Sequence, residues 1–409
     1  MKDKLIKRDI AEEILKYVGT DNIIVLHGSR QVGKTYILYY IENLLKSQNK
    51  LTFFFDLEDS RFVDVMDAGV DSFLSYLKNE GFKLDKIKND KEVLYVFIDE
   101  VQYLNNPSSL LKLLIDHHKY IQLIVSGSSS FDIKSKFADS LAGRTVDFEI
   151  FDLSFREFVR FKGLPYDLDS PMPEFHLNKV RELYQEYIFF GGYPKIVLED
   201  SIEKKEKYLQ QIIDTYIKKD IRDLAGVKDV KKFNNLLKIL AAQSGQLLNV
   251  TQTAKLCSLA KQTVEHYLFI LENTYVIKLV SPFSSSAKVE VVKAPKIFFY
   301  DTGLLQMLWL GNIQKNLIGN VFETSVFAEL VKKYGANNIN YWRNRNQNEI
   351  DFILRHKDRI MPIEVKQSFE NFRRLSMSSF CGKYKVSDYR VVSLKGQKQG
   401  KEYIYPWEV

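Results

Sequence analysis

The sequence predicts an α/β protein built from more than one domain. Between about residue 20 and residue 150, short continuous apolar runs alternate with longer amphipathic segments, as in a parallel βαβ domain. A second mixture of helical and strand-like segments fills the last hundred residues. The length of 409 residues agrees, since domains average about 150 residues. A hydrophobic share of 45% and a charged share of 27% exclude collagen-like and intrinsically disordered classes.

Cysteine use and hydropathy bear on the compartment. Cys257 and Cys381 are too few for a disulfide scaffold, and no Cys/His spacing fits a zinc site. The N-terminus is charged throughout, and no apolar run approaches the roughly 20 residues that span a bilayer. We expect a cytoplasmic protein without a membrane partner. The net charge of +7 is compatible with polyanion binding and equally with a solvated basic surface.

Four buried strands are expected in the N-terminal domain. Their runs are continuous rather than alternating, which is typical of a parallel sheet with helices on both faces. They lie at residues 23–27, 52–57, 93–98 and 122–126. The segment 59–91, between the second and third strands, reads as helical.

A glycine-rich turn joins the first strand to an amphipathic helix. Its sequence, GSRQVGKT, matches G-x-x-x-x-G-K-[ST] in full and in the required strand–loop–helix context. The residues of this phosphate-binding loop are Gly28, Ser29, Arg30, Gln31, Val32, Gly33, Lys34 and Thr35. Backbone amides would surround phosphate oxygens, Lys34 would reach the β- and γ-phosphates, and Thr35 would ligate Mg²⁺. The pattern predicts a P-loop NTPase domain that binds ATP and Mg²⁺.

Two acidic residues follow the third strand. Asp99 would be the second residue on the metal side, and Glu100 would act as general base toward the attacking water. A kinase would more often need the carboxylate for its acceptor, so the adjacent Glu100 favours hydrolysis.

Two further elements are candidates for the same site. The fourth strand ends in a serine-rich stretch, where Ser126 or Ser128 could contact the γ-phosphate or the lytic water. Beyond it, Arg144 could neutralise transition-state charge, in cis or across a subunit interface. A surface salt bridge is the alternative for Arg144.

Composition shifts divide the remainder of the chain. A Pro/Gly/Asp-rich loop at 163–174 marks the end of the first domain, and a Gly-Gly-Tyr-Pro turn interrupts the helical stretch that follows. We expect an ATPase domain at 1–160, a helical linker or lid at 161–230, a winged-helix module at 231–300 and a C-terminal α/β domain at 301–409.

Residues 247–280 read as a winged helix-turn-helix. Thr251 would cap the first helix, and the second would bury Val264, Leu268 and Leu271. In a DNA-binding module the second helix enters the major groove. The groove-facing residues would then be Lys261, Gln262, Thr263 and His266. Packing against another part of the protein is the alternative use of this module.

The C-terminal region contains two acids and a lysine in the D…E-x-K arrangement of restriction-type nucleases. Asp351 lies in one predicted strand, and Glu364 and Lys366 lie thirteen and fifteen residues later in the next. Alternation puts Glu364 and Lys366 on one face, so that the carboxylates could hold Mg²⁺ and Lys366 could stabilise a phosphate. Glu323, on the preceding helix, is the acid that this pattern expects upstream. A surface Glu364–Lys366 pair is the alternative.

The combination of HGSRQVGKT, VFIDEVQ, VSGSSS and SLAGRT resembles prokaryotic AAA+-type ATPases of uncharacterised cellular role, which carry C-terminal winged-helix and nuclease-like regions. The phrases LSFREF, FGGYP and FYDTGL are similar to recurring phrases of that family. The resemblance implies ATP binding and hydrolysis and no particular cellular process.

These observations together favour a Mg²⁺-dependent ATPase that couples hydrolysis to the handling of nucleic acid or a partner through its C-terminal domain. The partners considered are DNA and a second copy of the chain. Two alternatives stay open, an ATP-controlled switch with negligible turnover and a winged-helix DNA-binding regulator without nuclease activity.

Overall fold

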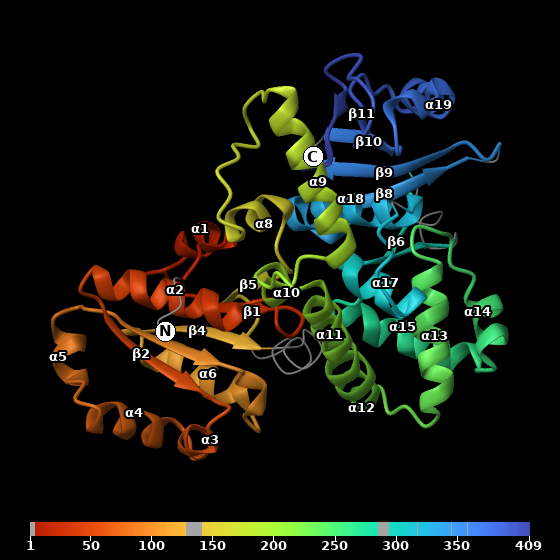
Figure 1. Cartoon of the computed structure of the whole chain (residues 1–409). Helices are drawn as coiled ribbons and strands as arrows, with labels where there is room; N and C mark the ends of the chain where they lie inside the picture. Colours follow the sequence, from red (N-terminus) through yellow and green to blue (C-terminus); the bar gives the residue numbers. More distant parts are fainter. Residues whose placement is uncertain (1–4, 128–140, 285–293, 317, 345, 358) are drawn as a thin grey trace. The chain divides into compact units, whose positions relative to one another are not determined.

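The computed structural model describes residues 5–127, 141–284 and 294–409, apart from residues 317, 345 and 358 (Figure 1). The chain forms two compact units, Met1–Phe151 (unit 1) and Asp152–Val409 (unit 2). The boundary lies nine residues before the one expected at residue 160. The reason is α8 (Phe155–Phe161), whose Phe155 ring packs on Tyr184 and Tyr187 inside unit 2.

Unit 1 is built on a five-stranded sheet in the order β2-β3-β4-β1-β5, with all neighbours parallel. The strands are β1 (Ile23–His27), β2 (Leu51–Asp56), β3 (Leu94–Asp99), β4 (Ile121–Gly127) and β5 (Thr145–Glu149). The four predicted strands are confirmed, and β4 lies between β1 and β3. The fifth strand was not predicted.

Helices cover both faces of this sheet (Figure 1). They are α1 (Ile10–Leu15), α2 (Lys34–Ser47), α3 (Ser60–Asp67), α4 (Val70–Asn79), α5 (Leu84–Asn89) and α6 (Pro107–His117), with a 3₁₀ turn η1 (Val101–Tyr103). Helices α3, α4, α5 and α6 pack on the strands in one hydrophobic core, in which Phe55, Phe73 and Ile98 are fully buried. The helical reading of 59–91 is confirmed as three short helices.

Unit 2 opens with helices. They are α8, α9 (Glu174–Phe190), α10 (Pro194–Val197), α11 (Ile202–Ile212), the π-helix η2 (Ile213–Ile221), α12 (Arg222–Leu224), α13 (Val230–Ala242) and α17 (Thr302–Leu310). The loop predicted at 163–174 separates α8 from α9. Helix α17 packs against α9 and α13.

Two helices and a hairpin occupy the region read as a winged helix. They are α14 (Val250–Cys257), α15 (Lys261–Asn273), β6 (Ile277–Val280) and the antiparallel β7 (Lys296–Phe299). Val264, Leu268 and Leu271 are buried as predicted. The expected cap was wrong: the side chain of Asn249, not Thr251, accepts the hydrogen bond of Gln252 N that caps α14.

The C-terminal sheet has the order β12-β11-β10-β9-β8. Its elements are α18 (Gly319–Tyr334), β8 (Ile339–Arg343), β9 (Glu349–His356), β10 (Arg359–Val365), α19 (Arg374–Tyr384), β11 (Arg390–Val392) and β12 (Tyr403–Ile404), with 3₁₀ turns η3 (Ala336–Asn338), η4 (Phe369–Asn371) and η5 (Pro406–Glu408). Strands β8, β9 and β10 are antiparallel, whereas β10, β11 and β12 are parallel. The two successive strands predicted to carry Asp351 and Glu364 are confirmed as the neighbouring antiparallel strands β9 and β10.

A buried polar network fixes the start of unit 2. Lys332 Nζ on α18 lies 2.8 Å from Asp152 Oδ1 and donates to the Leu153 carbonyl at 2.9 Å. It also donates to the Tyr187 hydroxyl at 2.7 Å. The Gly192 amide donates to Asp301 Oδ2 at 2.8 Å, and a Cβ at Gly192 would lie 2.4 Å from the Leu153 carbonyl oxygen. The segments LSFREF, FGGYP and FYDTGL, which are far apart in the sequence, are thus in contact with one another in unit 2.

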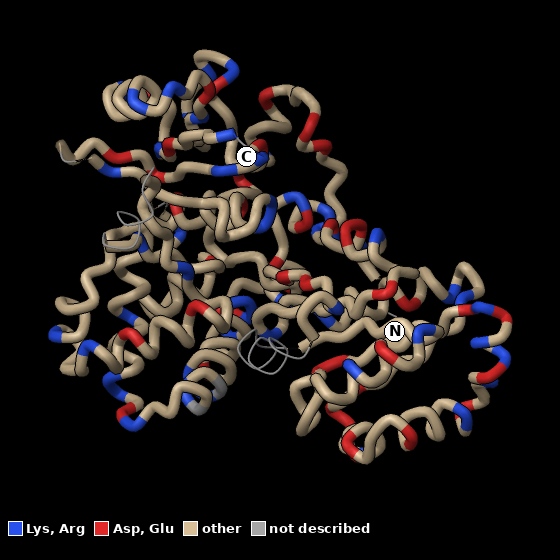
Figure 2. Tube along the Cα trace, turned by 180° about the vertical axis from the view of Figure 1, so that it is seen from behind, with Lys and Arg blue, Asp and Glu red and all other residues tan. Residues whose placement is uncertain are grey.

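Two further observations concern membrane-spanning helices and the distribution of charge. Within the described ranges, no helix combines the length and apolarity needed to cross a membrane. Figure 2 shows basic and acidic residues interspersed along the helices and strands of each unit.

Candidate functional site

The phosphate-binding loop connects β1 to α2 at the carboxyl edge of the parallel sheet. Gly33 adopts φ of +96° directly before the first residue of α2, a conformation that glycine reaches without steric cost. A Cβ on Gly28 would lie 2.0 Å from the Ile150 carbonyl oxygen, so only glycine fits at this position. The loop therefore needs both glycines of the motif for separate reasons.

Lys34 begins α2 and turns back over the loop. Its Nζ donates to the carbonyl oxygens of Gly28 at 3.1 Å and Ser29 at 2.8 Å, and the residue is buried. Burial lowers the pKa of Lys34 to about 8, although the nearby Glu100 and Asp99 carboxylates oppose the shift. An anion at this position would restore the usual preference of the amine for its charged form.

Asp99 ends β3 and joins three elements. Its Oδ2 accepts from Thr35 Oγ1 at 2.6 Å, and its Oδ1 accepts from the Ser126 hydroxyl of β4. Burial raises the pKa of Asp99, while these two hydrogen bonds lower it. Thr35 and Asp99 offer two oxygens side by side, and Mg²⁺ needs few protein ligands because it keeps waters and binds substrate phosphates. The residues present fit this ion.

Glu100 follows Asp99 in a left-handed conformation, with φ of +56°. Its amide donates to Ser126 Oγ at 3.3 Å, and its carboxylate accepts from the side-chain amide of Gln102. Non-glycine residues rarely hold this backbone conformation, which recurs where a side chain must be aimed at a functional site. Ser126 thus contacts both Asp99, the last residue of β3, and Glu100, which follows it.

Arg8 is a residue of this site that the sequence did not single out. It is buried, and its guanidinium donates to the Val32 carbonyl at 2.8 Å and to the Phe151 carbonyl at 2.9 Å. It ties the phosphate-binding loop to the end of unit 1. A lone arginine near an N-terminus belongs to no spacing motif, so nothing in the sequence marked it.

Arg144 lies away from the loop within one copy of the chain. It precedes β5, and its carbonyl accepts from Ile23 N at the start of β1, whereas the loop follows the end of β1. Five strand residues separate the two edges by about 16 Å. Its guanidinium pairs with Asp116 at 2.8 Å, as the surface alternative expected. A role in trans stays a prediction, and Ser128 lies outside the described residues.

The D…E-x-K residues lie close together where β9 begins and β10 ends, in the middle of the C-terminal sheet. Asp351 Oδ2 accepts from the Val365 amide at 2.8 Å, across the β9–β10 pair. Lys366 Nζ lies 2.6 Å from Glu364 Oε1 and 3.9 Å from Asp351 Oδ2. Val365 is buried between the two, which confirms the predicted alternation.

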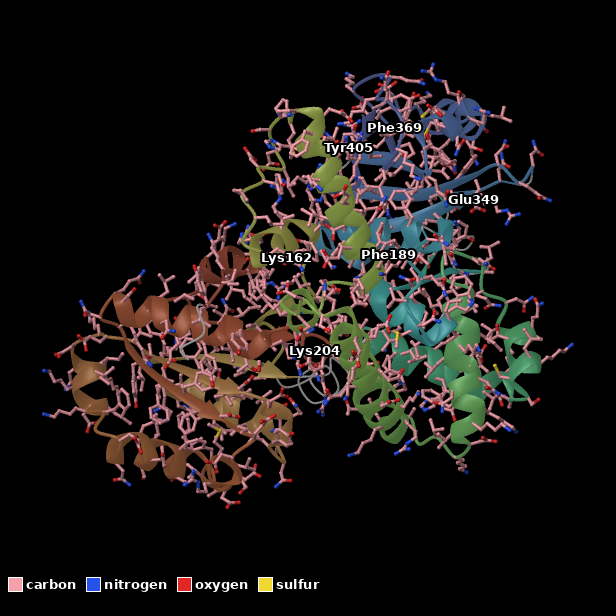
Figure 3. All side chains as sticks on the ribbon, viewed as in Figure 1. Lys162, Phe189, Lys204, Glu349, Phe369 and Tyr405 are labelled. Atoms are coloured by element: carbon pink, nitrogen blue, oxygen red, sulfur yellow. The ribbon has the colours of Figure 1, made fainter. Side chains whose placement is uncertain are left out.

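A second lysine, which the sequence did not reveal, enters the same cluster. Lys296 of β7 has a side chain only 3% exposed. Its Nζ lies 2.7 Å from Glu349 Oε1, 3.3 Å from Glu323 Oε1 and 3.9 Å from Asp351 Oδ1. Glu349, labelled in Figure 3, begins β9. A lone charge opening the apolar run of β7 was the available signal, because buried charges need partners.

The electrostatics of the cluster follow from its crowding. Burial, and then the Asp351 carboxylate, raise the pKa of both Glu323 and Glu364. Among the described residues, no group of three or more His, Cys, Asp or Glu side chains is arranged to hold a metal ion. Mg²⁺ needs only one or two carboxylates, however, and Glu364 Oε2 is buried without a hydrogen-bond partner in the described structure. Asp351 and Glu364 therefore fit one such ion.

The start of α15 is open to solvent. Lys261, Gln262 and His266 are exposed and Thr263 is half-buried. Lys261 forms an ion pair with Glu265 on the same helix at 3.3 Å. The four residues predicted to face DNA thus share an accessible helix end that carries both signs of charge.

Comparisons with known protein families divide the chain into three stretches. Residues 20–159 match a family described as an AAA domain. Residues 181–316 and 318–407 match two families that are each described as a domain of unknown function (DUF8612 and DUF4143).

The curated relatives span most of the chain. An uncharacterized protein of Haemophilus influenzae is 27% identical over 367 residues, which cover 88% of this chain and 86% of that protein. An uncharacterized protein of Methanocaldococcus jannaschii is 27% identical over 362 residues, covering 86% and 76%.

Two solved structures among the matches are AMPPCP-bound DnaA from Aquifex aeolicus and the Aeropyrum pernix ORC2 protein in its ADP form. The first has 18% identity, a TM-score of 0.28 and coverage of 64% of this chain and 86% of that chain. The second has 11% identity, a TM-score of 0.35 and coverage of 66% and 85%. The matched stretch 20–159 includes the phosphate-binding loop and all five strands of the unit 1 sheet, so this part of the chain is similar to an AAA domain.

Proposed function

We propose that this chain binds ATP with Mg²⁺ and hydrolyses it in unit 1. The observation that carries the proposal is the hydrogen bond of 2.6 Å between Thr35 Oγ1 and Asp99 Oδ2, because it puts two metal-side oxygens beside the buried Lys34.

Each residue has a separate task in this proposal. The backbone amides of the loop and Lys34 hold the phosphates, and Thr35 with Asp99 would hold Mg²⁺, which supplies charge neutralisation at the phosphates. Glu100 accepts a proton from the attacking water. Ser126, bonded to Asp99 and to the Glu100 amide, positions both acids.

The test separates binding from hydrolysis. We expect Lys34→Ala to abolish binding of a fluorescent ATP analogue. Glu100→Gln should keep that binding and lower steady-state phosphate release by about 10²- to 10⁴-fold. Glu80→Gln, an exposed acid at the end of α4, is the matched control and should behave as the parent. Parental hydrolysis by the Glu100→Gln protein would exclude Glu100 as the base, and negligible turnover by the parent would favour an ATP-controlled switch.

A second candidate function, divalent-cation-dependent cleavage of nucleic acid, is favoured by the carboxylate cluster of unit 2. Asp351 and Glu364 would hold the ion, which would supply Lewis-acid assistance at a phosphodiester. Lys366 lies within reach of both carboxylates and would stabilise the charged phosphate. A nuclease-like fold does not by itself imply cleavage, so this function depends on the site alone.

Cleavage is tested on supercoiled, linear and branched DNA with Mg²⁺ or Mn²⁺. We expect products from the parent and from Asp388→Asn, an exposed acid outside the cluster. The double variant Asp351→Asn/Lys366→Met should be inactive. Cleavage that persists in the double variant would be contamination, whereas duplex binding without cleavage would favour the DNA-binding regulator.

A further inference from the structure

Lys296 reaches the carboxylate cluster from outside the sheet that carries the cluster. It opens β7, which pairs with β6 and bridges to Leu247 beyond α13. Its Nζ lies over the ring of Tyr341 of β8, 5.9 Å from the ring centroid, and the Tyr341 hydroxyl donates to the Ala294 carbonyl at 2.6 Å.

The two lysines divide the carboxylates between them. Lys296 lies within 3.3 Å of Glu349 and Glu323, whereas Lys366 lies at 2.6 Å from Glu364. Asp351 stands between them, with Oδ1 3.9 Å from one ammonium and Oδ2 3.9 Å from the other. Asp351 is thus shared between two fixed positive charges.

Formal charge limits how many further cations the cluster can take. Four carboxylates and two ammonium groups leave two negative charges. Arg343, 3.6 Å from the outer oxygen of Glu349, reduces this to one if it is included. One divalent cation brings the formal charge to zero, or to +1 with Arg343, whereas a second would bring it to +2 or +3.

We propose that Lys296 is a fixed cation of this site, occupying the position of a second metal ion, so that the cluster takes one divalent cation at Asp351 and Glu364. Lys296 is thus a positioning residue that holds Glu323, Glu349 and Asp351. This proposal rests on the metal-dependent function proposed for unit 2.

The experiment counts Mn²⁺ ions bound by the nucleotide-free full-length chain, using the electron paramagnetic resonance signal of free Mn²⁺. The double variant Asp351→Asn/Glu364→Gln lacks the site, and ions that it still binds are subtracted as belonging elsewhere. We expect one remaining ion for the parent and two for Lys296→Met, the first of them about tenfold tighter because an adjacent positive charge is gone. Lys278→Met is the matched control, since Lys278 lies on the same hairpin and pairs with Glu272 at 2.7 Å. It should bind one ion.

The outcomes separate this inference from the function on which it rests. One ion with parental affinity in Lys296→Met would overturn the inference and leave the metal site standing. A parent that binds no more Mn²⁺ than the double variant would overturn the metal site and the inference with it. If Lys296→Met unfolds without metal, we expect Mn²⁺ to restore its folded circular dichroism spectrum; failure to restore it would also overturn the inference.

Discussion

At the scale of single residues, the buried amine of Lys34 would link ATP binding to a proton uptake that can be measured. Its ammonium is buried and donates to two loop carbonyls, and its pKa is lowered to about 8. The β- and γ-phosphates of ATP would favour the charged form and raise this pKa again. The free protein therefore holds fewer protons than the complex at and above pH 8.

We predict that ATP binding takes up about half a proton at pH 8, since half of the free lysine is then deprotonated, and that affinity falls as pH rises from 7.5 to 9.5. Calorimetric titration of the Glu100→Gln protein in buffers of different ionisation enthalpy measures the uptake. Lys34→Arg is the control, because an arginine stays charged throughout this range. Heats independent of the buffer at pH 8 would contradict the prediction.

At the scale of elements, α18 is tied at two places by buried charge. Near its start, Glu323 pairs with Lys296. Near its end, Lys332 forms an ion pair with Asp152 and donates hydrogen bonds to the Leu153 carbonyl and the Tyr187 hydroxyl. A buried carboxylate that loses its only nearby ammonium costs more than the pair itself contributes.

We expect Lys332→Met to lower the free energy of unfolding by about 3–5 kcal/mol, because it removes the ammonium that pairs with the buried carboxylates of Asp152 and Glu329. The neighbouring Lys333→Met should change it by less than about 0.5 kcal/mol, since Lys333 is exposed. Urea unfolding followed by circular dichroism measures both. A loss below about 1 kcal/mol in Lys332→Met would mean that the network contributes little to stability.

Strands buried on both faces could be predicted from the sequence. Features that depend on contacts with other parts of the chain could not. Strands β1, β3 and β4 read as apolar runs because every residue in them is buried. Strand β5 was not predicted, because its half-exposed residues Thr145–Glu149 form no continuous apolar run. Asn249 and Thr251 are both good caps, and tertiary packing selects between them.

The same division holds in the two sites. Lys34, Asp99, Asp351 and Glu364 belong to local motifs with fixed spacing, and the structure brings each set together. Arg8 and Lys296 act on residues that are distant in the chain, such as Val32 and Glu349. No local pattern encodes such contacts, because they depend on how the elements pack.

At the scale of the whole molecule, the chain is two units with separate cores. The proposed nucleotide site lies in unit 1, since its described residues all precede residue 127. The carboxylate cluster lies in unit 2. A ligand that binds one folded unit raises the stability of that unit by mass action.

We predict two transitions in differential scanning calorimetry, of which MgATP raises only the one belonging to unit 1. At a concentration 100 times the Kd the stabilisation is about 2.7 kcal/mol, or roughly 5–10 °C for a unit of this size. The Glu100→Gln protein avoids turnover during the scan, and Lys34→Ala is the control without a shift. A single transition displaced as a whole would show that the units unfold together.

The position of Lys296 has a consequence for inheritance. It lies in the stretch 181–316 matched by one family, whereas its partners Glu323, Glu349 and Asp351 lie in the stretch 318–407 matched by the next. A recombination event that cut between these stretches would leave the carboxylates with the partly exposed Lys366 and Arg343 and without their most buried cation. The C-terminal segment therefore does not carry the complete cluster: a descendant gene that preserved the cluster would have to keep the preceding hairpin, or evolve a new cation in its place.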